Sequence, residues 1–479
     1  MSPSAPLSAA GLGIGLGLAL LAGCSGSGGS NDAGGGVPPD QRADLGVFVI
    51  VVDSLMPQEI GAPLTPTPTL AAFQDAATTY TESRAVFYAE TIPNHVAMMT
   101  GVYPQRSGIP SNTYWNRQGE PEDRDLSLPS ELEVKTLFTR IKDECPNIRT
   151  AAALSKDYLY EVFSDCGFSG TDCGLNVAPD QHFNPTEDPT FIPSPAGLTP
   201  DVATMNAALA QLPNADFMFI NLGQVDRMGH ADETGITGVP LLRNAVLAET
   251  DLQIQRFILA LQQAGRWEKS VVFIVSDHGM DWSTPQNFIN VSSVVGPLGL
   301  FPIQNGGAES FYLTNPADPM RESKLLMART ALLALPGVQD AWYREPNSLD
   351  PDGITAQLPD HFRARHENIG DLVASAAPGW RFSDPSPQSN PIPGNHAHKI
   401  TLHNTFMIGG GAPFVRAQTI AEPDEPVDHF ERRPAQSENV DVAPTVAWLF
   451  GMNGDGFDGR VLTEAFDLAA PPTRCGVLR

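Results

Sequence analysis

The sequence predicts an α/β protein with a doubly wound, mostly parallel sheet and an inserted α+β subdomain. Three observations predict this fold class. Short apolar runs end abruptly in polar residues, helical patterns separate these runs, and a stretch near residues 281–394 breaks the alternation. Apolar runs of this length are typical of strands buried on both faces of a parallel sheet. Strands that alternate with helices indicate a doubly wound arrangement.

The apolar runs give four expected strands, and the patterns between them give the longer helices. The expected strands are 47–52 (VFVIVV), 217–222 (FMFINL), 271–275 (VVFIV) and 405–408. The expected helices are 69–77, 200–211 and 241–263. In doubly wound sheets, ligands bind beyond the carboxyl ends of the strands. The polar residues that follow these runs are therefore the first candidates for a functional site.

The stretch 281–394 is expected to form an insertion beside that site. It contains a strand-like segment at 310–313 and a helical pattern at 321–335, and proline-rich segments bound it. Because its elements do not continue the strand–helix alternation, we interpret it as a subdomain of one large domain, residues 43–479, and not as an independent unit.

The N-terminus indicates export. Residues 1–23 contain an apolar run rich in Gly, Ala and Leu that ends in Leu-Ala-Gly-Cys24, which resembles a bacterial lipobox with Cys24 as the lipidated residue. A transmembrane anchor is disfavoured because the run is short, rich in glycine and lacks a charged stop. Residues 24–42 are small and polar, as in a flexible tether. We therefore expect an exported protein held to the cell envelope by its N-terminal lipid, at the periplasmic face or the cell surface.

Charge and cysteine content limit the partners. The chain has 29 Lys and Arg against 55 Asp and Glu, a formal net charge of −26, which excludes broad binding of nucleic-acid polymers. Bound metal ions can still attract a small phosphorylated substrate.

Four cysteines remain beside Cys24, and an even number in an exported protein favours two disulfides with three pairings open. Zinc ligation and free buried thiols are the alternatives. The four are Cys145, Cys166, Cys173 and Cys475.

Thr91 stands at an expected helix start. The segment Thr91-Ile92-Pro93-Asn94-His95 precedes an apolar stretch, and proline is favoured just inside the first turn of a helix. A helix N-terminus attracts anions. A threonine hydroxyl becomes a nucleophile only when a metal or a base activates it, and threonine is also a common helix cap.

A set of aspartates and histidines shifts the balance towards catalysis. Asp226 and His230 are four residues apart, a spacing that places both side chains on one face of a helical turn. Single residues of these types are often turn caps or core residues. Together they offer carboxylate and imidazole ligands for two divalent cations, Zn²⁺ above all, with Mn²⁺ or Fe as alternatives. The remaining members are Asp53, Asp277, His278 and His396.

These motifs, in this order, resemble the alkaline phosphatase superfamily, and specifically the type I phosphodiesterase/nucleotide pyrophosphatase branch. The resemblance covers nearly all of residues 45–465. It is carried by the strand ending in Asp53, then TIPNHVAMMTGVYPQRSGI, VDRMGH, SDHGM and GNH, and finally VDVAPTVAWLFGM followed by DGR. It implies a metal-dependent hydrolase of phosphate esters.

The resemblance implies a role for each matching position. Thr91 matches the nucleophile, which would form a phosphothreonine intermediate, and Asn112 matches the residue that binds a phosphate oxygen together with a helix-start amide. His95, His398 and His403 match no ligand position. One metal site would be formed by Asp53, Thr91, Asp277 and His278, and the other by Asp226, His230 and His396.

Two alternatives remain beside a phosphodiesterase. A sulfatase would need Cys or Ser at position 91, and Thr91 argues against it. A phosphomonoesterase is harder to exclude, because Ser155-Lys156-Asp157-Tyr158 resembles half of the Lys-Asp-Arg stretch of threonine-dependent alkaline phosphatases, although Lys156 is also compatible with a solvated surface lysine. A non-catalytic lipoprotein would be expected to have lost a ligand. For the leaving group we expect a pocket formed by Tyr114-Trp115 and the insertion; the sequence leaves the oligomeric state open.

Overall fold

The computed structural model describes residues 44–122, 124–125, 129–164, 173–194, 196–353, 355–384, 386–421, 436–468 and 475. The expected signal segment 1–23, Cys24, the tether and Cys166 lie outside these residues. The described residues belong to one compact unit.

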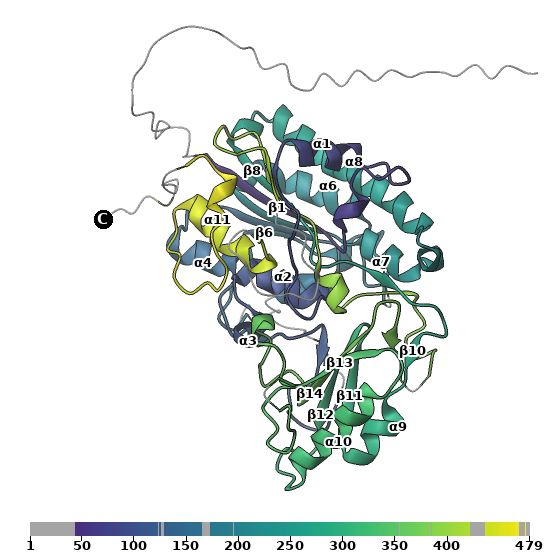
Figure 1. Ribbon diagram of the computed structural model, residues 1–479. Coiled ribbons are helices and arrows are strands. Elements are labelled where there is room, and N and C mark those ends of the chain that lie inside the picture. The colour runs from purple at the N-terminus through teal and green to yellow at the C-terminus, as the bar shows by residue number, and fades with distance from the viewer. Residues whose placement is uncertain are drawn as a thin grey trace, which may run out of the picture. The chain divides into compact units, whose positions relative to one another are not determined.

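An eight-stranded sheet forms the centre of the protein (Figure 1). Its order is β18-β2-β17-β8-β1-β7-β5-β6. Strand β17 is antiparallel to both of its neighbours, and the other pairings are parallel. The strands are β1 (Gly46–Val52), β2 (Thr78–Tyr80), β5 (Thr150–Leu154), β6 (Gln181–Phe183), β7 (Phe217–Leu222), β8 (Ser270–Val275), β17 (Phe406–Gly409) and β18 (Gln418–Ile420).

Helices cover both faces of this sheet, which confirms the doubly wound prediction. On one face α1, α6 and α8 pack on Phe48, Ile50 and Val52. On the other face α2, α4, α5 and α11 pack on Val47, Val49 and Val51 (Figure 1). The helices are α1 (Pro68–Asp75), α2 (Thr91–Thr100), α3 (Pro104–Ser107), α4 (Leu137–Glu144), α5 (Asp157–Phe163), α6 (Asp201–Gln211), α7 (Gln224–Ala231), α8 (Leu241–Gln263) and α11 (Val442–Phe450).

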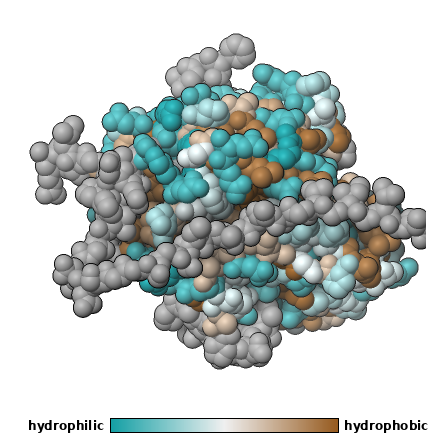
Figure 2. Space-filling model, turned by 90° about the horizontal axis from the view of Figure 1, so that it is seen from above, coloured by the Kyte–Doolittle hydropathy of each residue, from teal (hydrophilic) through white to brown (hydrophobic). Residues whose placement is uncertain are grey.

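Strand β1 shows why the sheet is buried on both sides. Every residue of Gly46–Val52 is buried, and alternate side chains enter the two opposite cores. The outer face seen in Figure 2 is mostly hydrophilic, with smaller hydrophobic areas between the polar residues. The apolar runs of the sequence therefore mark interior strands, as expected for a parallel sheet.

A second, antiparallel sheet lies within the expected insertion. Its order is β11-β12-β14-β13, and α10 packs on it (Figure 1). Its elements are β11 (Leu300–Asn305), β12 (Ala308–Leu313), β13 (Val338–Tyr343), β14 (Leu372–Ala376), α9 (Ser292–Val295) and α10 (Arg321–Leu333). Three two-stranded ribbons complete the fold: β3 (Thr113–Tyr114) with β4 (Arg124–Asp125), β9 (Asp281–Trp282) with β16 (Gly394–Asn395), and β10 (Phe288–Ile289) with β15 (Arg381–Phe382).

One cysteine pairing is now defined. Cys145 and Cys475 form a disulfide with a Cα–Cα distance of 5.3 Å, which ties the end of α4 to the C-terminal segment. Cys173 is also disulfide-bonded. The structure thus chooses among pairings that the sequence left open.

Candidate active site

The candidate ligands meet at the carboxyl ends of three neighbouring strands. Asp53 follows β1, Asp277 and His278 follow β8, and α7, which carries Asp226 and His230, follows β7. These strands lie next to one another in the sheet, with β1 in the middle. The candidate ligands therefore lie at the carboxyl ends of the strands, where the general rule for doubly wound sheets places ligand sites.

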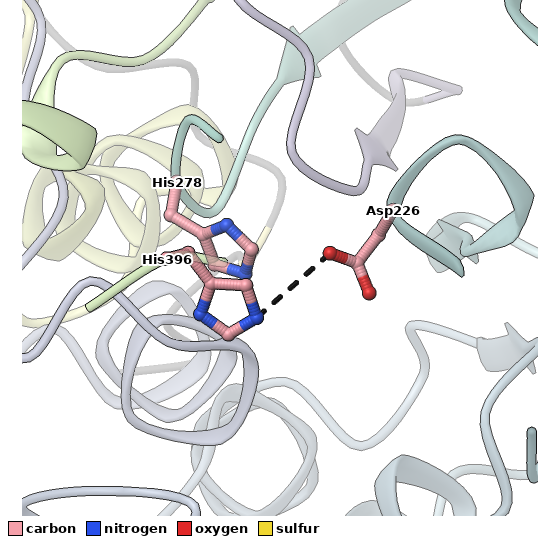
Figure 3. A group of neighbouring side chains, drawn as sticks. All are labelled: Asp226, His278 and His396. Atoms are coloured by element: carbon pink, nitrogen blue, oxygen red, sulfur yellow. Dashed lines mark ion pairs between the residues drawn. The ribbon is translucent and has the colours of Figure 1, made fainter. Parts of the chain in front are cut away.

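Two buried groups of side chains have the composition of metal sites. The first consists of Asp53, Asp277 and His278, and the second of Asp226, His278 and His396; within each group the ligand atoms lie within 4.8 Å of one another. The second group is shown in Figure 3, where His396 Nε2 lies 3.9 Å from Asp226 Oδ1. The rings of His278 and His396 stack with centroids 3.9 Å apart.

His230, expected in the second group, lies on its border. Its Nε2 is 3.4 Å from Asp226 Oδ1, one turn away on α7, and its ring centroid is 5.0 Å from that of His396. The structure therefore brings His230 to Asp226 as the four-residue spacing predicted, and it adds His278 as a neighbour common to both groups.

The aspartates leave one oxygen each for a cation. Among the described residues, Asp53 Oδ1, Asp226 Oδ1 and Asp277 Oδ2 are buried and accept no hydrogen bond. The second oxygen of each carboxylate is held in place. Asp277 Oδ1, for example, accepts from the amides of Ser54 and His278 at 2.9 and 3.0 Å. A buried carboxylate oxygen without a partner is costly, so this arrangement fits bound metal ions.

Hydrogen bonds orient the three histidines in the same way. Nδ1 lies 2.7 Å from the Gly394 carbonyl in His230, 2.9 Å from the Gly279 carbonyl in His278 and 3.1 Å from the Ala89 carbonyl in His396. Because a carbonyl only accepts, Nδ1 carries the proton and Nε2 keeps a free lone pair. Burial lowers the pKa of all three imidazoles, which favours the neutral form that binds metals.

Thr91 is the first residue of α2, as the sequence predicted, but it does not cap the helix. Glu90 occupies the N-cap position. The Thr91 hydroxyl instead lies 3.4 Å from His278 Nε2 and 3.2 Å from Lys156 Nζ. The Thr91 hydroxyl thus lies beside both acidic groups and does not serve as a helix cap.

Asn112 is held against the same helix start. The side-chain Oδ1 of Asn112 accepts from the Ile92 backbone amide at 2.7 Å. The backbone amide of Asn112 donates to Glu90 Oε2 at 2.8 Å. The Ile92 amide at the helix start is therefore already paired with Asn112. The Asn112 Nδ2 group is the donor that this arrangement leaves for an oxyanion.

Lys156 is not a solvated surface residue. Its side chain is fully buried, and Nζ lies 2.9 Å from Asp53 Oδ2 and 2.8 Å from Asp226 Oδ2. Burial alone would lower the pKa of Lys156, but the two carboxylates outweigh it and raise the pKa above its usual value. The ammonium group therefore stays charged and bridges the two acidic groups.

Sequence reasoning missed Asn221 and the contacts of His95. Asn221 Nδ2 lies 3.0 Å from Asp53 Oδ2 and 3.0 Å from His95 Nε2, and its Oδ1 accepts from Ser155 Oγ at 2.6 Å. His95 Nδ1 in turn lies 2.8 Å from the Thr91 carbonyl. The signal was an asparagine inside the apolar run 217–222, since a buried amide in a strand needs partners.

A cavity of about 280 Å³ opens onto Thr91. Residues from the insertion form part of its wall, as expected. Tyr114 is not among the lining residues; its side chain is 2% exposed and packs in the core of the main domain, while Thr113 faces the cavity instead. The lining residues are Glu90, Thr91, Asn112, Thr113, Tyr158, Asp226, Arg227, His230, Gln304, Asn305, Gly306, Ser389, Asn390, Ile392, Asn395 and His396.

Fold and site together define a metal-binding phosphate-ester hydrolase of the alkaline phosphatase superfamily. A family model for type I phosphodiesterase/nucleotide pyrophosphatase matches residues 47–398. The chain belongs to this family.

Curated relatives and solved structures agree with this assignment. The bis(5'-adenosyl)-triphosphatase enpp4 of Xenopus laevis is 21% identical over 401 residues, 82% of this chain and 75% of the relative. Its counterpart in Bos taurus is 25% identical over 379 residues, 77% and 70% of the two chains. Human ectonucleotide pyrophosphatase/phosphodiesterase 5 shares the fold, with a TM-score of 0.65 at 15% identity over 88% of this chain and 100% of that one. The murine protein has the same values in an inactive threonine-to-alanine variant in complex with AMP.

Proposed function

We propose that the protein hydrolyses phosphodiester or pyrophosphate bonds of small nucleotide-like substrates through a phosphothreonine intermediate on Thr91. The observation that carries this proposal is the position of the Thr91 hydroxyl, at a helix start and within 3.4 Å of His278 in a site rich in unpartnered carboxylate oxygens. The names of the relatives, bis(5'-adenosyl)-triphosphatases, support a diester or pyrophosphate substrate.

Two divalent metal ions, zinc by the composition of the ligands, would complete the site. Asp53, Asp277 and His278 would hold one ion together with Thr91 Oγ1. Asp226, His230 and His396 would hold the other. When bound, such ions lower the pKa of a coordinated hydroxyl or water and stabilise charge on the attacking and leaving oxygens.

The protein side chains then have distinct tasks. Thr91 Oγ attacks phosphorus, a new P–O bond forms in line with the bond that breaks, and the leaving group departs as an alcohol or phosphate. Water then attacks the same phosphorus and releases Thr91. Asn112 Nδ2 donates to a non-bridging oxygen. Lys156, which donates to Thr91 Oγ1 at 3.2 Å, favours the alkoxide form of the nucleophile.

A phosphomonoesterase of the same superfamily remains the second candidate. The observation in its favour is the buried, charged Lys156 beside Thr91, because an ammonium group there offers attraction to the additional charge of a monoester. Kinetics on a monoester and a diester with the same leaving group decide between the two candidates.

The test of the covalent mechanism is Thr91→Ala. Turnover should fall by several powers of ten, since a covalent nucleophile is lost, while elemental analysis should still find both metals. Thr91→Ser should keep part of the activity, because it restores a hydroxyl. Thr100→Ala, at the other end of α2, is the matched control and should behave like the wild type. Unchanged hydrolysis by Thr91→Ala would overturn the mechanism.

We further propose that the protein is exported and attached to a membrane through a lipid on Cys24. The resemblance of the segment ending at Cys24 to a lipobox supports this proposal. In the described part of the chain, none of the helices combines the length and apolarity that crossing a bilayer requires.

A further inference from the structure

Arg227 stands out among the residues that line the active-site cavity. It follows Asp226 directly on α7, and its side chain forms part of the cavity wall together with Thr91 and Asn112. Its Nε is buried and has no hydrogen-bond partner in the described residues. Its one ring contact is with Tyr158, whose centroid lies 5.8 Å from the guanidinium carbon.

Arg243, which is fully buried, shows the kind of partners that Arg227 lacks. The guanidinium of Arg243 makes two hydrogen bonds to the carboxylate of Glu59, at 2.7 and 2.8 Å, and others to Ser54. A guanidinium has five donors, and a donor that is buried without an acceptor costs free energy. Arg227 as a whole is half-buried, and its Nε is buried without an acceptor among the described residues, so a ligand in the cavity can supply one.

The charges around the cavity show where an anionic ligand would lie. The wall contributed by the insertion consists of neutral residues, among them Gln304, Asn305, Ser389 and Asn390. The positive charge of Lys156 is directed at Asp53 and Asp226. Arg227 is the one Lys or Arg side chain among the lining residues, and within the described residues no carboxylate forms a direct ion pair with it, so positive charge faces the cavity from the α7 side.

We infer that Arg227 binds the negative charge that a substrate carries beyond that of a simple phosphodiester. The substrate class is a polyanionic phosphate ester, in which a monoester phosphoryl group or a second, pyrophosphate-linked phosphate supplies the additional oxygens. The planar guanidinium suits two parallel hydrogen bonds to such oxygens, and it lies over the Tyr158 ring. This inference rests on the proposed function and makes Arg227 a specificity-determining residue.

Arg227→Gln tests the inference on three substrates. These are p-nitrophenyl phosphate, bis(p-nitrophenyl) phosphate and a dinucleoside polyphosphate. A hydrogen bond to a charged group corresponds to about a 10- to 100-fold change. We expect kcat/KM to fall by about that factor more for at least one of the two polyanionic substrates than for bis(p-nitrophenyl) phosphate. A selective loss on the monoester places Arg227 at the transferred phosphoryl group, and a selective loss on the polyphosphate places it at the neighbouring phosphate.

Two further variants and a binding measurement complete the test. Arg227→Lys should recover part of the discrimination, because it keeps the charge without the planar pair of donors. Arg416→Gln removes an equal charge from the surface and should leave the ratios of the wild type. Binding of inorganic phosphate to metal-loaded Thr91→Ala protein, measured by calorimetry, should weaken about tenfold when Arg227→Gln is added if Arg227 lies at the transferred phosphoryl group, and should stay unchanged if Arg227 lies at the neighbouring phosphate.

Equal losses on all three substrates, or no loss at all, would overturn the inference. That result differs from a failure of the proposed mechanism. The mechanism fails when Thr91→Ala still turns over, whereas the discrimination by Arg227 is measured as a ratio between substrates in proteins that keep Thr91.

Discussion

At the scale of single residues, the site is defined by which atom of each side chain already forms a hydrogen bond and which atom does not. Each of the three candidate histidines pairs Nδ1 with a backbone carbonyl, and each aspartate has one oxygen without a partner in the described residues. The atoms that remain are the ones that a divalent cation uses. Asn112 follows the same logic, because the Ile92 amide occupies its oxygen and leaves its nitrogen as a donor.

Asn112→Ala should lower kcat by about two to three powers of ten, the usual cost of removing one oxyanion donor. Metal content should stay at the wild-type level, since Asn112 lies in neither ligand group. Steady-state kinetics with elemental analysis measures both. Asn390→Ala, another carboxamide on the cavity wall, is the control and should have a much smaller effect. If the two variants lose equal activity, Asn112 has no special part in charge stabilisation.

At the scale of elements, Arg243 of α8 connects the loops that carry the two ligand groups. Its side chain is fully buried and donates to the Ser54 carbonyl at 2.7 Å and to the Val225 carbonyl at 3.0 Å. Ser54 follows Asp53, and Val225 precedes Asp226. One guanidinium therefore holds the segments that carry a ligand of each group, and Glu59 neutralises it.

Arg243→Met should lower the free energy of unfolding by about 3 to 5 kcal/mol, because Glu59 is left buried without its partner. Urea denaturation measures this loss. The double variant Arg243→Met/Glu59→Met should recover part of the stability but not the retention of metal, since Ser54 and Val225 still lose their donor. Full metal retention in the double variant would show that Arg243 stabilises the fold without positioning the ligands.

Asp201, at the start of α6, makes the stability of the protein around α7 depend on pH. It accepts from the Gln224 amide at 3.1 Å and from Thr250 Oγ1 at 2.6 Å. Burial raises the pKa of Asp201 to about 7, against 3.8 for an ordinary aspartate. Between these values the folded state holds a proton that the unfolded state has released, so this contribution to stability is complete below about pH 4 and is lost as the pH rises towards 7.

Asp201→Asn should therefore stabilise the protein at pH 8.5 relative to the wild type, by up to about 4 kcal/mol. At pH 5 the difference should be much smaller, because the native carboxyl group is then protonated. Urea unfolding of both proteins at the two pH values measures the change. Asp467→Asn, on the surface, serves as the control. A difference that does not vary with pH would contradict the raised pKa.

At the scale of the whole molecule, charge and disulfides are the features that relate to the proposed substrate and the proposed export. The net charge of −26 agrees with a small metal-bound substrate and not with a nucleic-acid polymer. The Cys145–Cys475 disulfide joins residues 330 positions apart, and Cys173 is disulfide-bonded as well. Disulfides persist in oxidising compartments, which supports the proposed export.

Cys24→Ser should move the protein out of the membrane fraction, either as released soluble protein or as an unprocessed precursor. The reason is that the residue proposed to carry the lipid can no longer be acylated. Fractionation followed by intact-mass analysis distinguishes these outcomes from the lipidated wild type. An unchanged membrane fraction with the wild-type mass would contradict acylation at Cys24.

The sequence by itself determined the parts of the fold that local pattern controls. The strand 217–222 and the helix 241–263 were predicted with the bounds that β7 and α8 have. The run of alanines in β5 was missed, because alanine does not distinguish a strand from a helix or a loop. The direction of β17 was also missed, since an apolar run is the same whether its neighbours are parallel or antiparallel.

The tertiary structure decided what depends on distances between segments far apart in the chain. Motif order was enough to nominate Asp53, Asp226 and His278, because ligands collect at the carboxyl ends of parallel strands. It could not show that His278 lies in both ligand groups or that Lys156 is buried between Asp53 and Asp226. Sequence records which donors and acceptors exist, but packing alone decides which of them are already paired and which remain for a metal or a substrate.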